Sequence, residues 1–118
     1  MKVNITKIDP PFAGQFIEEF LKANENIFNE DAFAEGIRWR LTNMPGVTVF
    51  VASIDGNMVG FKAGYATAIN KYYSWLGGVD PEFRQKGIGK NLMEAQHNWI
   101  EQNTSYSVVK TQTAEDNA

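Results

Sequence analysis

The stretch GGVDPEFRQKGIGKNLMEAQ, residues 77–96, decides the fold that we expect for this chain. Gly77 and Gly78 lie inside an apolar run, and Gly87 and Gly89 follow a short polar turn. Glycine inside a strand typically marks a bulge or the close approach of another backbone. Glycines where a helix begins let an anion approach the unpaired N–H groups of its first turn. The pattern therefore predicts a strand, a turn and a helix.

Basic residues surround the second pair of glycines, at Arg84, Lys86 and Lys90. Taken singly, each glycine pair has a structural explanation, the first as a bulge and the second as a turn. Both pairs together, in a strand-turn-helix context with cations nearby, favour an anion-binding site at the start of the helix.

Two familiar phosphate-binding patterns fail at specific positions. A P-loop would need glycine at Arg84 and a hydroxyl residue at Asn91. A dinucleotide-binding fingerprint would need glycine near Leu92 and an acidic residue at the end of the next strand, where VVKTQT has none. The anion is therefore expected to be held in a different way.

The hydrophobic pattern along the chain changes between helical and strand periods. It predicts helices from Phe12, from an Asn29 cap to Asn43, and from the polar turn to Gln102. Strands are predicted over residues 2–8, 47–54, 58–69, 75–79 and 106–113, with a hairpin turn at 55–57 and a loop at 70–74. The order β-α-α-β-β-β-α-β predicts an α/β fold, a mixed, mostly antiparallel sheet with flanking helices. Its last strand should run parallel to the one before, through a right-handed crossover.

Composition narrows the class of protein. We expect residues 1–118 to form a single domain, and a net charge of -3 does not favour nucleic acid as a partner. No apolar run is long enough for a membrane span, and the N-terminus lacks the apolar core of a signal peptide. With no cysteine and one histidine, disulfides and a histidine-rich metal site are excluded. We therefore expect a cytoplasmic protein without a metal.

Residues 84–89 read Arg-x-x-Gly-x-Gly, which resembles the signature of the GNAT family of N-acetyltransferases. In that family a strand, a turn of this pattern and a helix hold the pyrophosphate of coenzyme A. Here GGVDPEF stands in the place of the family's V-x-P-x-x lead-in, and the expected order of elements follows the family's over nearly the whole chain.

The resemblance implies an acetyl-CoA-dependent N-acetyltransferase that transfers acetyl directly to a primary amine, without a covalent enzyme intermediate. It implies that the backbone of Gly78 and Val79 pairs with the pantetheine arm, and that a bulge at Gly77 and Gly78 splays two strands apart. A backbone N–H near Gly77 would polarise the thioester carbonyl. The residues implied to hold the pyrophosphate are Arg84, Gln85, Lys86, Gly87, Ile88, Gly89 and Lys90.

The sequence also departs from the family pattern. Many members carry a general base on the fourth strand, but SWLGGV has no carboxylate, and Asp80 before Pro81 is typical of a turn. The alternative is a general base that acts through a water molecule. In the family, a helix and two further strands follow, and that helix often carries the tyrosine that protonates the leaving thiolate. We therefore expect an incomplete domain that lacks these elements and this tyrosine. The alternative function is a non-catalytic module that binds coenzyme A or self-associates through the exposed edge of its fifth strand.

No motif in the sequence identifies the acceptor. Each candidate residue for the acceptor site also has a structural explanation. The candidates are Trp39, Lys62, Tyr65, Tyr73 and Trp75. Trp39 could instead pack in the core, and Lys62 could instead be a surface lysine. Tyr73 and Trp75 could instead belong to an aromatic core. His97 falls on the helix face of Lys90 and Glu94, which predicts a solvated side chain without a catalytic role.

Overall fold

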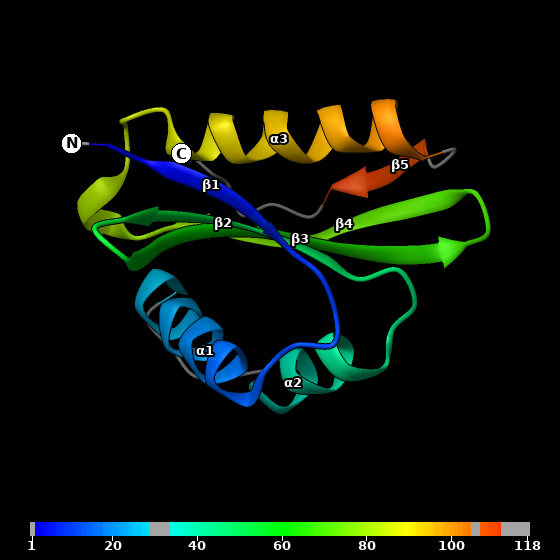
Figure 1. Cartoon of the computed structure of the whole chain (residues 1–118), viewed down its shortest axis with the longest axis horizontal. Helices are drawn as coiled ribbons and strands as arrows, with labels where there is room; N and C mark the ends of the chain where they lie inside the picture. Colours follow the sequence, from blue (N-terminus) through cyan, green and yellow to red (C-terminus); the bar gives the residue numbers. More distant parts are fainter. Residues whose placement is uncertain (1, 29–33, 105–106, 112–118) are drawn as a thin grey trace.

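The computed structural model describes residues 2–28, 34–104 and 107–111, with the backbone alone for residues 103 and 107–111. Its elements follow the order expected from the sequence (Figure 1). They are β1 (Asn4–Ile8), α1 (Gly14–Phe28), α2 (Ala34–Asn43), β2 (Thr48–Ile54), β3 (Asn57–Ala68), β4 (Lys71–Val79), the 3₁₀ turn η1 (Pro81–Phe83), α3 (Ile88–Asn103) and β5 (Ser107–Thr111).

The strands form one sheet in the order β1-β2-β3-β4-β5. Neighbours from β1 to β4 are antiparallel, and β5 runs parallel to β4, as the strand-helix-strand pattern predicted. The hairpin turn at Asp55 and Gly56 is confirmed by positive φ angles of 53° and 82°. The predicted cap at Asn29 and residues 106, 112 and 113 of the predicted last strand lie outside the described residues.

One boundary in the middle of the sheet was predicted wrongly. Residues 71–74 belong to β4, so the connection from β3 is only the two-residue turn at Ile69 and Asn70. The tyrosines and the serine of this segment resemble a polar loop in sequence, but Tyr72 and Ser74 are buried against the rest of the fold.

Helices cover both faces of the sheet, with α1 and α2 on one side and α3 on the other (Figure 1). Alternate residues of β2 serve the two faces, because successive side chains of a strand point in opposite directions. Val49 and Val51 pack beneath α1 and α2, whereas Phe50 and Ala52 pack beneath α3. This explains why nearly every residue of β2 is buried.

Aromatic rings anchor α1 to the sheet. Phe12, Phe16 and Phe20 follow one another at helical spacing, with ring centroids 5.4 and 6.1 Å apart. The last of them meets Phe61 of β3 at 4.2 Å. The apolar repeat that predicted this helix therefore continues into the core of the sheet.

The pairing of β3 with β4 contains one extra residue on β4. Ala63 pairs with Leu76 and Gly64 with Ser74, which leaves Trp75 without an opposite residue. We expected a bulge at Gly77 and Gly78, but those two glycines pair in regular register with Lys62 and Phe61. The expected position was wrong because glycine permits a bulge without specifying the register.

A second feature of β4 depends on a glycine in β3. The ring of Tyr72 lies across Gly64 and forms a hydrogen bond with the Thr48 hydroxyl of β2. A Cβ on Gly64 would come within 2.4 Å of the Tyr72 ring and hydroxyl. Tyr72 is fully buried and also meets Trp99 of α3, so this contact ties three strands to the helix.

We therefore expect Gly64→Ala to lower the free energy of unfolding by about 1–3 kcal/mol, because the added methyl overpacks a buried ring. Denaturant unfolding measures the change. Gly14→Ala is the control, since a Cβ there meets nothing within 4 Å. Equal stability of Gly64→Ala and the unchanged protein would contradict this account of Tyr72.

Candidate functional site

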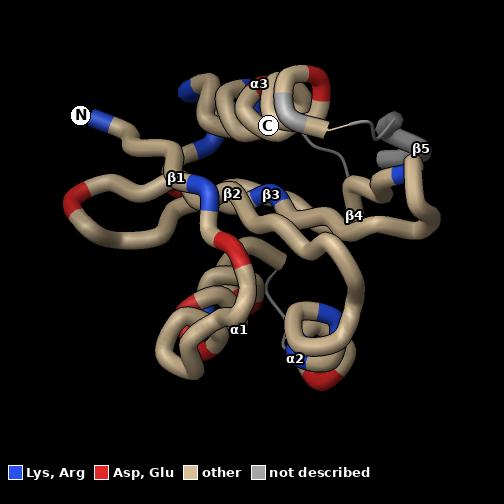
Figure 2. Tube along the Cα trace, turned by 45° about the vertical axis from the view of Figure 1, so that its right-hand side comes forward, with Lys and Arg blue, Asp and Glu red and all other residues tan. Residues whose placement is uncertain are grey.

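The start of α3 presents backbone N–H groups that no capping side chain satisfies. Gly87 is the N-cap, in the left-handed conformation with φ 81° and ψ 5°, and it makes no side-chain cap. Gln85, two residues earlier, also has a positive φ of 64°. The turn is exposed, and Figure 2 shows basic positions close to the beginning of α3. This arrangement can bind an anion through the amides of Ile88, Gly89 and Lys90.

Arg84 contacts the backbone rather than extending toward that turn. Its Nε donates to the carbonyl oxygen of Val79 at 2.9 Å, and its Nη2 donates to the carbonyl oxygen of Ile27 at 3.2 Å. Ile27 lies in the last turn of α1, where carbonyl groups lack helical partners and a cation is favourable. Arg84 thus joins the end of α1 to the end of β4.

Gly78 makes the same junction possible from the other side. A Cβ on Gly78 would lie 2.6 Å from Cγ2 of Ile27, so the end of α1 packs directly on the backbone of β4. Gly77 instead faces Lys62, whose Cδ would be 3.0 Å from an added Cβ. The two glycines therefore serve close packing on opposite faces of the sheet.

The edge of β4 that faces away from β3 pairs with β5 over only part of its length. β5 pairs with β4 from Lys71 to Ser74, and residues 75–79 have no strand partner on that side within the described part of the chain. The free edge leads from Ser74 to Val79 and, through η1, to the start of α3. Asp80 belongs to this connection as expected, since its carboxylate caps η1 by accepting from the Glu82 amide at 2.9 Å.

Polar side chains gather beneath α3 at the place where β4 and β5 part. Ser74 Oγ donates to Oε1 of Gln96 at 3.0 Å, and both residues are buried. Among the described residues, neither Nε2 of Gln96 nor Nε2 of His97 has a hydrogen-bond partner, and both atoms are buried. Burial lowers the pKa of His97, and the charge of Lys62 lowers it further, whereas Glu101 acts in the opposite direction.

The sequence reasoning missed Gln96 and misplaced His97. Gln96 continues the apolar stripe of Ile88, Leu92 and Ile100 at intervals of four residues, and a polar residue in such a stripe was the available signal. His97 is half-buried, contrary to the solvated side chain that we predicted.

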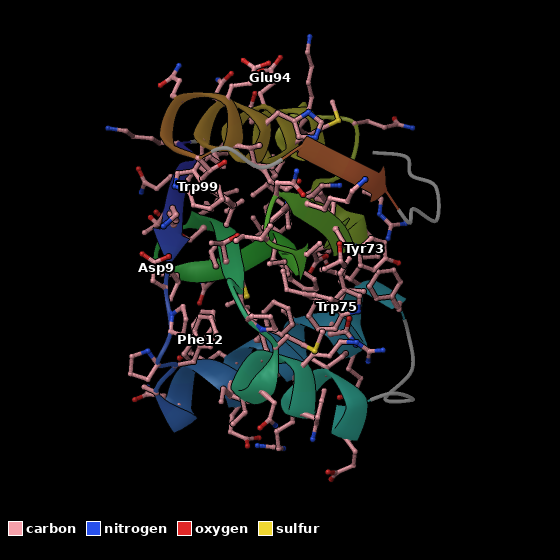
Figure 3. The ribbon with its side chains drawn as sticks, turned by 90° about the vertical axis from the view of Figure 1, so that its right-hand side faces the viewer. Asp9, Phe12, Tyr73, Trp75, Glu94 and Trp99 are labelled. Atoms are coloured by element: carbon pink, nitrogen blue, oxygen red, sulfur yellow. The ribbon has the colours of Figure 1, made fainter. Side chains whose placement is uncertain are left out.

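Three of the five acceptor candidates come together. The ring of Tyr65 lies 5.6 Å from Tyr73 and 5.7 Å from Trp75, and Arg40 of α2 stacks 5.5 Å from the centre of Trp75. Trp75 lies between the sheet and α2, with Tyr73 nearby (Figure 3). We call Tyr65, Tyr73 and Trp75 the aromatic cluster.

The other two candidates lie apart from the aromatic cluster. Lys62 is on the α3 face, since it is three residues from Tyr65 on the same strand and the two side chains point to opposite faces. Trp39 is 58% exposed, so the alternative explanation of core packing is wrong for this residue.

The described residues contain no group of three or more His, Cys, Asp or Glu side chains that could hold a metal ion. Among their helices, none combines the length and the apolar character that crossing a membrane requires.

Because Arg84 joins two elements, we expect Arg84→Ala to reduce the free energy of unfolding by about 1–2 kcal/mol through the loss of two charge-assisted hydrogen bonds. Lys86→Ala is the matched control, since it removes the same charge from the same exposed turn and should change stability by less than about 0.5 kcal/mol. Denaturant unfolding of both variants compares them. An equal effect of the two substitutions would show that Arg84 contributes only charge.

Comparison with known proteins places this geometry among acetyltransferases. Residues 45–118 match the family model of the acetyltransferase (GNAT) domain, which is more than half of the chain. A comparison with curated proteins found no match.

Solved structures with the same fold include several acetyltransferases. An aminoglycoside acetyltransferase from an uncultured soil metagenomic sample, in complex with sisomicin, is 22% identical with a TM-score of 0.75, over 96% of this chain and 78% of that one. The ribosomal-protein-alanine N-acetyltransferase from Brucella melitensis is 20% identical with a TM-score of 0.70, over 93% and 80%. An aminoglycoside N-acetyltransferase in complex with CoA is 19% identical with a TM-score of 0.68, over 96% and 78%.

At these identities the solved structures show a shared fold, and the family model adds the relationship in sequence. The chain belongs to the family of GNAT acetyltransferase domains.

Proposed function

We propose that this protein is an acetyl-CoA-dependent N-acetyltransferase that transfers acetyl directly to a primary amine of its acceptor. The observation that carries the proposal is the continuity between the free edge of β4 at residues 75–79 and the uncapped start of α3. One feature offers backbone groups to an extended chain, and the other offers amides to an anion. Coenzyme A combines an extended pantetheine arm with a pyrophosphate.

The residues present fit this cofactor. The amides of residues 85–90 would hold the pyrophosphate, because Gly87 leaves open space where a side chain would otherwise stand. Lys86 and Lys90 add positive charge at this exposed turn. The backbone of Gly78 and Val79 would pair with the arm. Arg84 would act by positioning the turn, since its guanidinium is held by two carbonyl groups.

The reaction joins an acetyl group to nitrogen and releases a thiol. Acetyl-CoA supplies the activated thioester, so transfer forms a C–N bond as the C–S bond breaks. The backbone N–H near Gly77 would donate to the thioester oxygen, where negative charge develops. β4 carries no carboxylate, so we propose that the amine loses its proton through water.

The aromatic cluster supports a site for the acceptor on the face of α1 and α2. Aromatic faces attract ammonium groups, and Arg40 already uses the face of Trp75 in this way. Acidic positions lie along α1 (Figure 2), which favours a cationic acceptor approaching this side. Exposed Trp39 of α2 would form part of the same wall. Lys62 is not proposed for this site, since it serves the opposite face.

Turnover separates an enzyme from a module that only binds. Release of thiol from acetyl-CoA should depend on an added primary amine, tested with sisomicin and with a peptide that begins with alanine, the acceptors suggested by the related structures. Binding of acetyl-CoA without amine-dependent release would favour the alternative of a non-catalytic coenzyme A-binding module. Self-association through β5 stays a separate prediction, which the solution mass on dilution would test.

A pair of matched glycine variants tests the anion site. Gly87 and Gly56 have φ angles of 81° and 82°, and a Cβ on either meets nothing within 4 Å. Alanine at either position should therefore cost a similar strain of about 1–2 kcal/mol. Only Gly87→Ala should weaken binding of coenzyme A, by about tenfold in calorimetry, because its turn meets the pyrophosphate. Equal affinity of the two variants would refute the anion site at α3.

A further inference from the structure

Gln96 is a buried side chain whose hydrogen bonding the described residues leave incomplete. It is 0% exposed and stands in the sheet-facing stripe of α3. Ser74 satisfies one end of its carboxamide by donating to Oε1, and the donor Nε2 has no partner in the described part of the chain. Buried amide groups are paired in nearly all native structures, so an unpaired donor at this depth calls for an explanation.

The position of Gln96 relates this donor to the free edge of β4. Ser74 is the last residue of β4 that pairs with described residues of β5. Gln96 lies eight residues after the start of α3, about 12 Å along the helix axis. Residues 74–79 of β4 span about 16 Å. A ligand with its anionic end at the start of α3 and its body along β4 would therefore reach the Ser74–Gln96 pair with its uncharged end.

The chemistry of Nε2 restricts what that end can be. An amide N–H₂ donates and does not accept, so its partner must carry a lone pair, such as a carbonyl oxygen. Ser74 fixes the orientation of the carboxamide by occupying the oxygen, which directs the nitrogen to the remaining partner. Nε2 of the neighbouring His97 is also buried, so water has little access to the surroundings of Gln96 Nε2.

We propose that Gln96, oriented by Ser74, donates from Nε2 to a carbonyl oxygen of the pantetheine arm of coenzyme A and so sets how far the arm enters between β4 and β5. The assignment rests on the proposed function, since it takes coenzyme A as the ligand. Gln96 is then a binding residue and Ser74 a positioning residue.

The test compares two ligands and two variants by calorimetry. Coenzyme A carries the arm, and adenosine 3′,5′-bisphosphate carries the same nucleoside and two of its phosphates, without the arm and without the second phosphate of the pyrophosphate. The double variant Ser74→Ala/Gln96→Met removes both hydrogen-bonding partners together, so no new unpaired group is created in the core. We expect it to bind coenzyme A about three- to tenfold more weakly, the range for one lost hydrogen bond, and to bind the bisphosphate as before.

Asn24 supplies the matched control. It is a second buried amide side chain, and no described residue pairs with its Oδ1, but it lies in α1 on the other face of the sheet. Asn24→Leu should leave the affinities for both ligands unchanged. A loss of coenzyme A affinity in this variant equal to that of the double variant would overturn the proposal, because the effect would then follow from any change in core polarity.

The remaining outcomes also decide. Unchanged affinity of the double variant for coenzyme A overturns the proposal, and so does an equal loss for the bisphosphate, which would indicate a disturbed turn. Should the variant fail to fold, NMR of the unchanged protein decides, since the Gln96 side-chain NH₂ signals should shift with coenzyme A and not with the bisphosphate. Absence of coenzyme A binding by the unchanged protein would refute the proposed function itself.

Discussion

The extra residue that β4 carries at Trp75 is the constraint on which the arrangement of the site depends. Tyr73 and Trp75 share a face by regular alternation, but the next residue, Leu76, packs on the same side, toward α1 and α2, instead of turning toward α3. Ser74, whose side chain points away from those of Tyr73 and Trp75, faces Gln96 of α3. Pairing with β5 in the described residues also ends at this point. The aromatic cluster and the Ser74–Gln96 pair therefore lie next to the bulge, on opposite faces of the sheet.

The junction between α1 and β4 links this bulge to the turn before α3, where we propose that an anion binds. Gly78 allows Ile27 to approach the strand, and Arg84 holds the carbonyl groups at the ends of both elements. The turn that begins α3 is therefore fixed by the packing of α1 on the opposite face of the sheet. Residues that resemble a cofactor signature in sequence thus also maintain the fold, and Arg84 does so through both of its hydrogen bonds.

The periodicity of the sequence was sufficient to predict the order of elements, and the glycine pattern was sufficient to predict the turn before α3. Both features depend on local backbone preferences. Strand register does not depend on local backbone preferences. For this reason the bulge was expected at the glycines, whereas the structure has it at Trp75. The opposite faces of Lys62 and Tyr65 follow from their odd spacing, which the sequence reasoning overlooked. The contact of Tyr72 with Gly64 and Thr48 joins residues of three strands, so no local pattern indicated it.

The central claim is that coenzyme A lies along the free edge of β4 with its pyrophosphate at the start of α3. Backbone amide NMR of the unchanged protein during titration with coenzyme A tests it most directly. We expect the amides of residues 75–79 and 87–90 to shift together and to gain protection from hydrogen exchange, while those of the hairpin at Gly56 stay unchanged. Binding that shifts only amides of α1 and α2, with residues 75–79 and 87–90 unaffected, would contradict the claim.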